Sequence, residues 1–231
     1  MFWLMGGWDN RPDPLTSAVD RLQRSLQRLP DEAGKYGPWG VWQRQDSSNE
    51  LDFVRVEVND AAVLADVIAQ VTEEVRGGPT TRPGLNIELS RPTVGQLPEG
   101  SPIWCKYIVR AGFIDMPKPF NHIAFDVGDD TDERTLTAYM SALVDAWQPD
   151  RLGVLNVEIK RAQGHKGAEA AVGRLTYVRE GVPLDTSVLG DGIDVAHADG
   201  GSYIRVPGTP ENPSLDHIFQ VRRALGYEAG R

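Results

Sequence analysis

Three segments of the chain repeat apolar residues at the three- and four-residue spacing of an amphipathic helix, and a fourth lies near the C-terminus. Asp60 is a good N-cap for the second segment, while Pro30 and Pro149 end the first and third. Such stripes bury one side of a helix, so we expect four helices packed against another layer. They span about 15–29, 60–76, 131–147 and 213–228.

Apolar and polar residues alternate in several segments between these helices, as is typical of half-buried antiparallel strands. "LNIELS" is the clearest case, and "IDVAHADGGSYIRVP" predicts a hairpin that turns at Asp199–Gly200–Gly201. The N-terminal segment, about 1–12, is expected to form a strand over 1–8 followed by a turn. Other strands are expected around 39–42 and over 103–110, 121–127, 152–159 and 174–180. Because helices and strands alternate irregularly, we predict an α+β fold: one domain over 1–231, with a largely antiparallel mixed sheet and about four helices packed on it.

The stretch "DAWQPDRLGV" contains two carboxylates, Asp145 and Asp150, that raise the question of a catalytic pair. Pro149 pushes the preceding residue out of the helical region, so the third helix must end near Trp147. A catalytic pair needs two carboxylates that converge on one cleft, and nothing in this junction requires that. We therefore predict a structural junction in which Trp147 packs inward and Asp150 binds amides of the turn.

Composition places limits on the class of protein. At 231 residues the chain can bury a sizeable core, and no run approaches the ~20 apolar residues of a membrane span. The apolar start lacks a basic region, so we expect no signal peptide and no membrane partner. A single cysteine excludes an internal disulfide and a cysteine-based zinc site, which fits a cytoplasmic protein.

Residues that could carry chemistry are scattered. Cys105 lies in an apolar strand, where an inert buried thiol is expected, and the "HAD" triplet at His197–Asp199 reads as a turn. There is no G-x-S-x-G elbow and no phosphate-binding loop, so we predict no catalytic residues, no metal and no cofactor. The basic side of the first helix is too short for a nucleic-acid interface, so we expect no direct nucleic-acid binding; it comprises Arg21, Arg24 and Arg28.

The net charge of −9 is concentrated in residues 51–150, which hold sixteen Asp and Glu against eight Lys and Arg. The densest part, "FDVGDDTDER", precedes the third helix, and the dipole of a helix stabilises negative charge at its N-terminus. We expect Thr131 or Asp130 to be the N-cap of this helix. These carboxylates lack the spacing of an EF-hand loop, so the segment does not match that type of calcium site. A cap needs fewer carboxylates than are present, so the remainder could imitate a phosphate backbone for a basic partner. The five are Asp126, Asp129, Asp130, Asp132 and Glu133.

A series of motifs runs through most of the chain: "GGWDNRPDP", the leucine-striped first helix, "LNIELS", "VDAWQPDRLGV", "GRLTYV", "GGSYIRV" and a terminal helix. In this order the chain resembles the immunity protein 52 family of bacterial polymorphic toxin systems, whose members carry an A-W-x-P-D junction and a G-W-L-T-Y-L strand. Arg174 departs from that pattern, which has tryptophan there. The resemblance implies that the matching residues are signatures of the fold: Trp147, Pro149, Asp150, Gly173, Leu175, Thr176 and Tyr177.

The resemblance implies binding without catalysis. Such proteins neutralise a cognate secreted toxin in the cytoplasm of the producing cell, and the family is associated with nucleases of the restriction-endonuclease-like class. A nuclease needs a basic cleft, which an acidic inhibitor would complement, so we expect the toxin contact on or near Asp126–Glu133. The alternatives are a small cytoplasmic hydrolase that uses His122 or His197, and a non-catalytic adaptor domain. A toxin gene beside this one would favour immunity.

Overall fold

The computed structural model describes residues 2–44, 51–76, 83–94, 104–116, 120–128, 130–164 and 172–227. These ranges contain ten strands: β1 Phe2–Trp8, β2 Gly40–Arg44, β3 Leu51–Arg55, β4 Leu85–Pro92, β5 Trp104–Ala111, β6 Asn121–Val127, β7 Arg151–Leu155, β8 Leu175–Arg179, β9 Asp194–Ala198 and β10 Gly201–Arg205. They form one sheet in the order β3-β2-β4-β5-β6-β1-β7-β8-β10-β9. All of its neighbouring strands are antiparallel, which confirms the predicted α+β fold.

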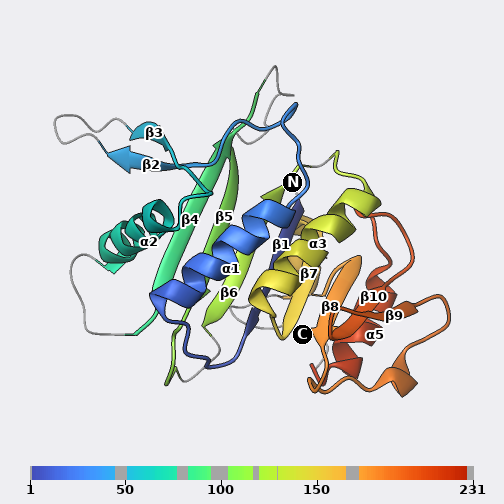
Figure 1. Ribbon diagram of the computed structural model, residues 1–231. Helices are drawn as coiled ribbons and strands as arrows, with labels where there is room; N and C mark the ends of the chain where they lie inside the picture. Colours follow the sequence, from blue (N-terminus) through green and yellow to red (C-terminus); the bar gives the residue numbers. More distant parts are fainter. Residues whose placement is uncertain are drawn as a thin grey trace.

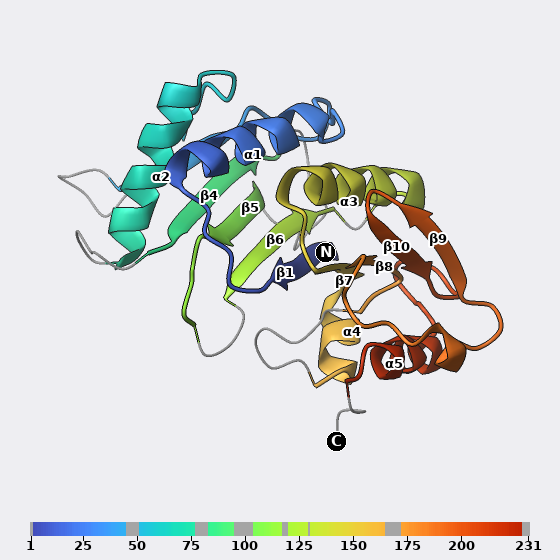
Figure 2. The same ribbon diagram turned by 60° about the horizontal axis from the view of Figure 1, so that its bottom comes forward.

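Helices cover the two faces of this sheet unequally. The five helices are α1 Leu15–Arg28, α2 Ala61–Arg76, α3 Glu133–Trp147, α4 Val157–Ala162 and α5 Leu215–Ala224, with a 3-10 turn η1 at Thr186–Val188. The first three lie side by side over one face, whereas α4 and α5 lie on the other face beneath β7, β8 and β10 (Figure 1, Figure 2). Among the described residues, no helix combines the length and the apolar character that a membrane crossing requires.

Strand alternation explains this layering. Along β6 every second residue is buried, so Ile123 and Phe125 face the α1–α3 layer while Asp126 points to the opposite face. The larger core lies between that layer and the sheet, and Trp147 at the end of α3 stacks there on Trp8, with ring centroids 6.0 Å apart. A smaller core forms under α4 and α5, around Ile204 of β10.

The helix α4 corrects the predicted strand over 152–159. The strand ends at Leu155, because the Asn156 side chain accepts a hydrogen bond from the Ile159 amide (2.8 Å) and caps a short helix. The apolar residues of this segment suit either element, so the cap residue decides between them. The predicted hairpin is confirmed, since β9 and β10 pair on either side of Asp199 and Gly200.

Candidate functional site

Three of the five acidic residues predicted to meet a partner, Asp130, Asp132 and Glu133, lie at the start of α3. Asp132 is its N-cap, and its carboxylate accepts hydrogen bonds from the Thr135 amide and hydroxyl, both at 2.9 Å. These bonds hold the pKa of Asp132 below its ordinary value. The prediction that Thr131 or Asp130 caps the helix is therefore wrong, because Asp132 is the residue in extended conformation directly before the first turn.

The neighbouring carboxylates are paired with cations from distant parts of the chain. Asp130 accepts a hydrogen bond from Lys35, which lowers its pKa. Glu133 binds two guanidinium groups, Arg174 at 3.3 Å and Arg205 at 2.7 Å. Arg174 thus ties the segment before β8 to the start of α3. These pairs neutralise part of the acidic segment within the molecule itself.

Asp126 lies apart from these residues, on the face of the sheet opposite to α3. Its carboxylate accepts a hydrogen bond from the Lys106 amide (3.3 Å), and burial raises its pKa above the ordinary value. Asp129, the fifth candidate, is outside the described residues. The structure therefore brings Asp130, Asp132 and Glu133 together and separates Asp126 from them, and their role in binding a toxin stays a prediction.

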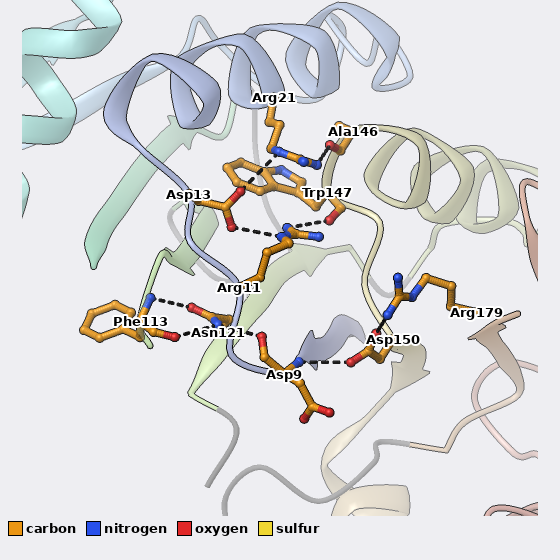
Figure 3. Close-up of polar contacts among 10 residues, drawn as sticks. All are labelled: Asp9, Arg11, Asp13, Arg21, Phe113, Asn121, Ala146, Trp147, Asp150 and Arg179. Carbon is orange, nitrogen blue, oxygen red and sulfur yellow. Dashed lines mark hydrogen bonds and ion pairs between the residues drawn. The ribbon is translucent and has the colours of Figure 1, made fainter. Parts of the chain in front are cut away.

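Two of the sequence stretches singled out above meet where the loop after β1 passes the end of α3 (Figure 3). Arg11 and Arg21 donate hydrogen bonds to the last carbonyls of this helix, Trp147 O at 3.0 Å and Ala146 O at 2.9 Å. Positive charge is favourable at a helix C-terminus, and Asp13 holds both guanidinium groups in place. The stretches "GGWDNRPDP" and "AWQPD" are thus two halves of one contact.

Asp150 completes this contact from the start of β7. Its carboxylate accepts a hydrogen bond from the Asp9 amide (2.9 Å) and pairs with Arg179 of β8. The buried side chain of Asn121 fixes the same loop from the other side, donating to Asp9 O at 3.0 Å (Figure 3). Asp145 instead pairs with Arg28 of α1 (2.9 Å). The two carboxylates of the junction therefore serve different contacts and do not converge.

The stretch "GRLTYV" is also part of the structural framework. A Cβ atom on Gly173 would lie 1.6 Å from Val154 O, so only glycine lets the chain lie this close to the backbone of β7. The Thr176 hydroxyl accepts a hydrogen bond from the Gly173 amide (3.0 Å), and Leu175 is in the core. Tyr177 donates a hydrogen bond to Asp199 O (3.0 Å) and so joins β8 to the hairpin tip.

The residues examined for catalysis occupy separate sites. The Cys105 thiol is buried and donates to Asp126 O (3.0 Å), and burial raises its pKa far above the ordinary value. His122 contacts Phe120 O, His197 contacts Ser202, and His217 contacts Ser214; His165 is outside the described residues. In the described part of the chain, no group of three or more His, Cys, Asp or Glu could hold a metal ion.

A second acidic segment was missed by the sequence prediction, which placed the excess negative charge in residues 51–150. Residues 180–216 contain seven Asp and Glu but only one Lys or Arg, which is Arg205. Its guanidinium group is paired with Glu133. A charge count over a shorter window would have found this segment. In the fold this segment forms the β9–β10 hairpin and the chain on either side of it, and Arg205 of β10 reaches the start of α3.

Comparisons with known proteins bear on the fold. No protein-family model matches the chain, and no curated protein matches it. Among solved structures, the chain is similar to a T6SS protein of Pseudomonas aeruginosa, with a TM-score of 0.54 and 10% sequence identity, over 97% of this chain and 72% of that one. At this identity the likeness concerns the fold alone.

Proposed function

We propose that this chain is an immunity protein, an antitoxin that binds a cognate secreted toxin and neutralises it in the cytoplasm of the producing cell. The observation that carries the proposal is the similarity in fold, along nearly the whole chain, to a protein named for the T6SS. Type VI secretion delivers toxins between competing bacteria, and a cell that makes such a toxin needs an inhibitor of it. The resemblance of its sequence motifs to those of the immunity protein 52 family supports the same proposal.

Charge supports a nuclease as the toxin. The chain carries a net charge of −9, and a nuclease must present a basic cleft to hold the phosphates of its substrate. Complementary charge accelerates association and disfavours wrong partners. We therefore propose that the toxin is a basic nuclease of the restriction-endonuclease-like class and that the inhibitor needs no cofactor.

The contact surface proposed from sequence is the acidic segment at the start of α3. Asp132 is exposed and forms no ion pair with a described residue, whereas the charges of Asp130 and Glu133 are partly offset by Lys35, Arg174 and Arg205. Reversing the charge of Asp129, Asp130 and Asp132 together should slow association with the toxin and make it less sensitive to salt. Unchanged rates and salt dependence would remove this segment from the interface.

Co-expression tests the function itself. We expect a toxin gene beside this one; the toxin domain that it encodes is expressed in a bacterial host with and without this chain, and survival and DNA integrity are measured. We expect survival, intact DNA and co-purification of the two proteins when both are present. Cell death at equal expression of both proteins, with no complex recovered, would contradict the proposal.

A further inference from the structure

The strand β9 (Asp194–Ala198) is the outer edge of the sheet, and it pairs with β10 alone among the described strands (Figure 1, Figure 2). Four of its five residues are exposed. The turn residues Asp199 and Gly200 have φ values of 52° and 71°, as in a two-residue type I′ hairpin. Ala198 and Gly201 then form a hydrogen-bonded pair, and alternate residues of β9 point their backbone groups away from β10. These residues are Val195 and His197.

This edge is held in a fixed shape by contacts at the hairpin tip. The Asp199 carboxylate accepts hydrogen bonds from Tyr203 (2.6 Å) and from Ser141 of α3 (3.0 Å). Its backbone carbonyl accepts a hydrogen bond from Tyr177, and Glu180 donates its amide to Gly200 O at 2.9 Å. A strand fixed in this way loses little conformational entropy when another strand pairs with it.

Charge determines which strand could pair with it. Asp194 is the first residue of β9 and Asp191 lies three residues before it; both are exposed, and neither forms an ion pair with a described residue. A parallel copy of β9 would bring Asp194 against Asp194, and an antiparallel copy would place Asp194 opposite Ala198, so neither arrangement offers this carboxylate a cation. A basic strand would meet complementary charge instead. Along β9 Asp194 and Val195 face opposite sides of the sheet, so a suitable partner would alternate basic and apolar residues.

We propose that the outer edge of β9 is the docking strand of this protein, and that an extended segment of the toxin with alternating basic and apolar residues adds to the sheet there. This inference rests on the proposed function and assigns the surface of this chain that contacts the toxin. The start of α3 flanks the same surface, because Arg205, opposite Asp194 in β10, is bound by Glu133. Main-chain hydrogen bonds would supply affinity, and the carboxylates would set orientation and speed of association.

A matched pair of variants at one position tests the backbone contact. His197→Pro removes an outward N–H but keeps the bonds to β10, since His197 and Ser202 are a non-hydrogen-bonded pair. His197→Ala removes the side chain and keeps the N–H. We expect His197→Pro to weaken binding to the toxin domain about tenfold or more and His197→Ala to change it less than about twofold. Circular dichroism and thermal unfolding establish that both variants fold.

A second pair of variants tests the charge contribution. Asp191→Lys with Asp194→Lys should slow toxin association and weaken its salt dependence. The control, Asp66→Lys with Glu73→Lys, makes the same change in net charge on the exposed side of α2, which contacts β4 toward the other end of the sheet. Equal effects of the two pairs would show that only total charge matters and would contradict docking at β9.

A probe that needs no toxin separates this inference from the proposed function. A short synthetic peptide that alternates lysine and valine is added to the wild-type protein, and amide hydrogen exchange is followed by NMR. We expect slower exchange at Val195 and His197 with this peptide and none of this protection with a glutamate–valine peptide. Unchanged exchange at both amides would overturn the docking strand. Protection by the peptide with no binding of the toxin domain would instead contradict the immunity function alone.

Discussion

The two carboxylates of the junction give the most direct test of how this chain uses its acidic residues. Asp150→Ala removes the acceptor of the Asp9 amide and the partner of Arg179. Asp145→Ala, five residues earlier in the same segment, removes only the partner of Arg28. The two substitutions are chemically identical, so a difference between them reports the structural environment of each residue.

The expected magnitudes follow from burial. A hydrogen bond to a charged, buried acceptor contributes about 1.5–3 kcal/mol, and the pair with Arg179, whose side chain is 47% exposed, adds at most about 1 kcal/mol. Asp150→Ala should therefore lower the free energy of unfolding by about 1.5–4 kcal/mol, which at this chain length is a fall in Tm of about 3–16 °C. Asp145→Ala should cost less than about 1 kcal/mol, because the side chains of Arg28 and Asp145 are 52% and 34% exposed and water screens their attraction. In addition, a carboxylate is unfavourable near a helix C-terminus.

Guanidinium unfolding followed by tryptophan fluorescence measures both values, since Trp147 is buried next to the junction. Equal losses for the two variants, or a stable Asp150→Ala protein, would refute the structural role assigned to Asp150. Toxin neutralisation by folded Asp150→Ala protein should match that of the wild type. A loss of activity with stability unchanged would point to chemistry at Asp150.

Three further predictions concern individual residues. Gly173→Ala should destabilise the fold by at least about 3 kcal/mol in chemical unfolding, because its Cβ would overlap Val154 O, whereas Gly34→Ala, where a Cβ meets nothing within 4 Å, should be neutral. Asp132→Ala should reduce stability at neutral pH, because folding lowers the pKa of Asp132. The difference from the wild type should be present above about pH 4, the unfolded pKa, and should vanish as the pH falls through the folded pKa. Urea titrations at a series of pH values measure it. A difference that persists in strong acid would contradict the cap. Cys105 should react with a thiol reagent only after unfolding, and fast labelling of the native protein would show that the thiol is accessible.

Much of the local structure could be predicted from the sequence, because apolar periodicity depends on residues a few positions apart. The leucine stripe of α1, the alternation of β4 and the Asp–Gly turn of the hairpin each contain their own signal. The end of α3 follows in the same way from Pro149. The short helix α4 was missed because its apolar residues also fit a strand, and one side-chain cap from Asn156 decided the outcome.

The distribution of charge on the surface was decided by the tertiary structure. Asp130 and Glu133 look free in sequence, yet their partners Lys35, Arg174 and Arg205 come from segments far away along the chain. Likewise, the position of β9 at the open edge depends on the order of ten strands, which no local pattern contains. Periodicity records the conformation of a segment, whereas neutralisation and exposure depend on which distant segments the fold brings together.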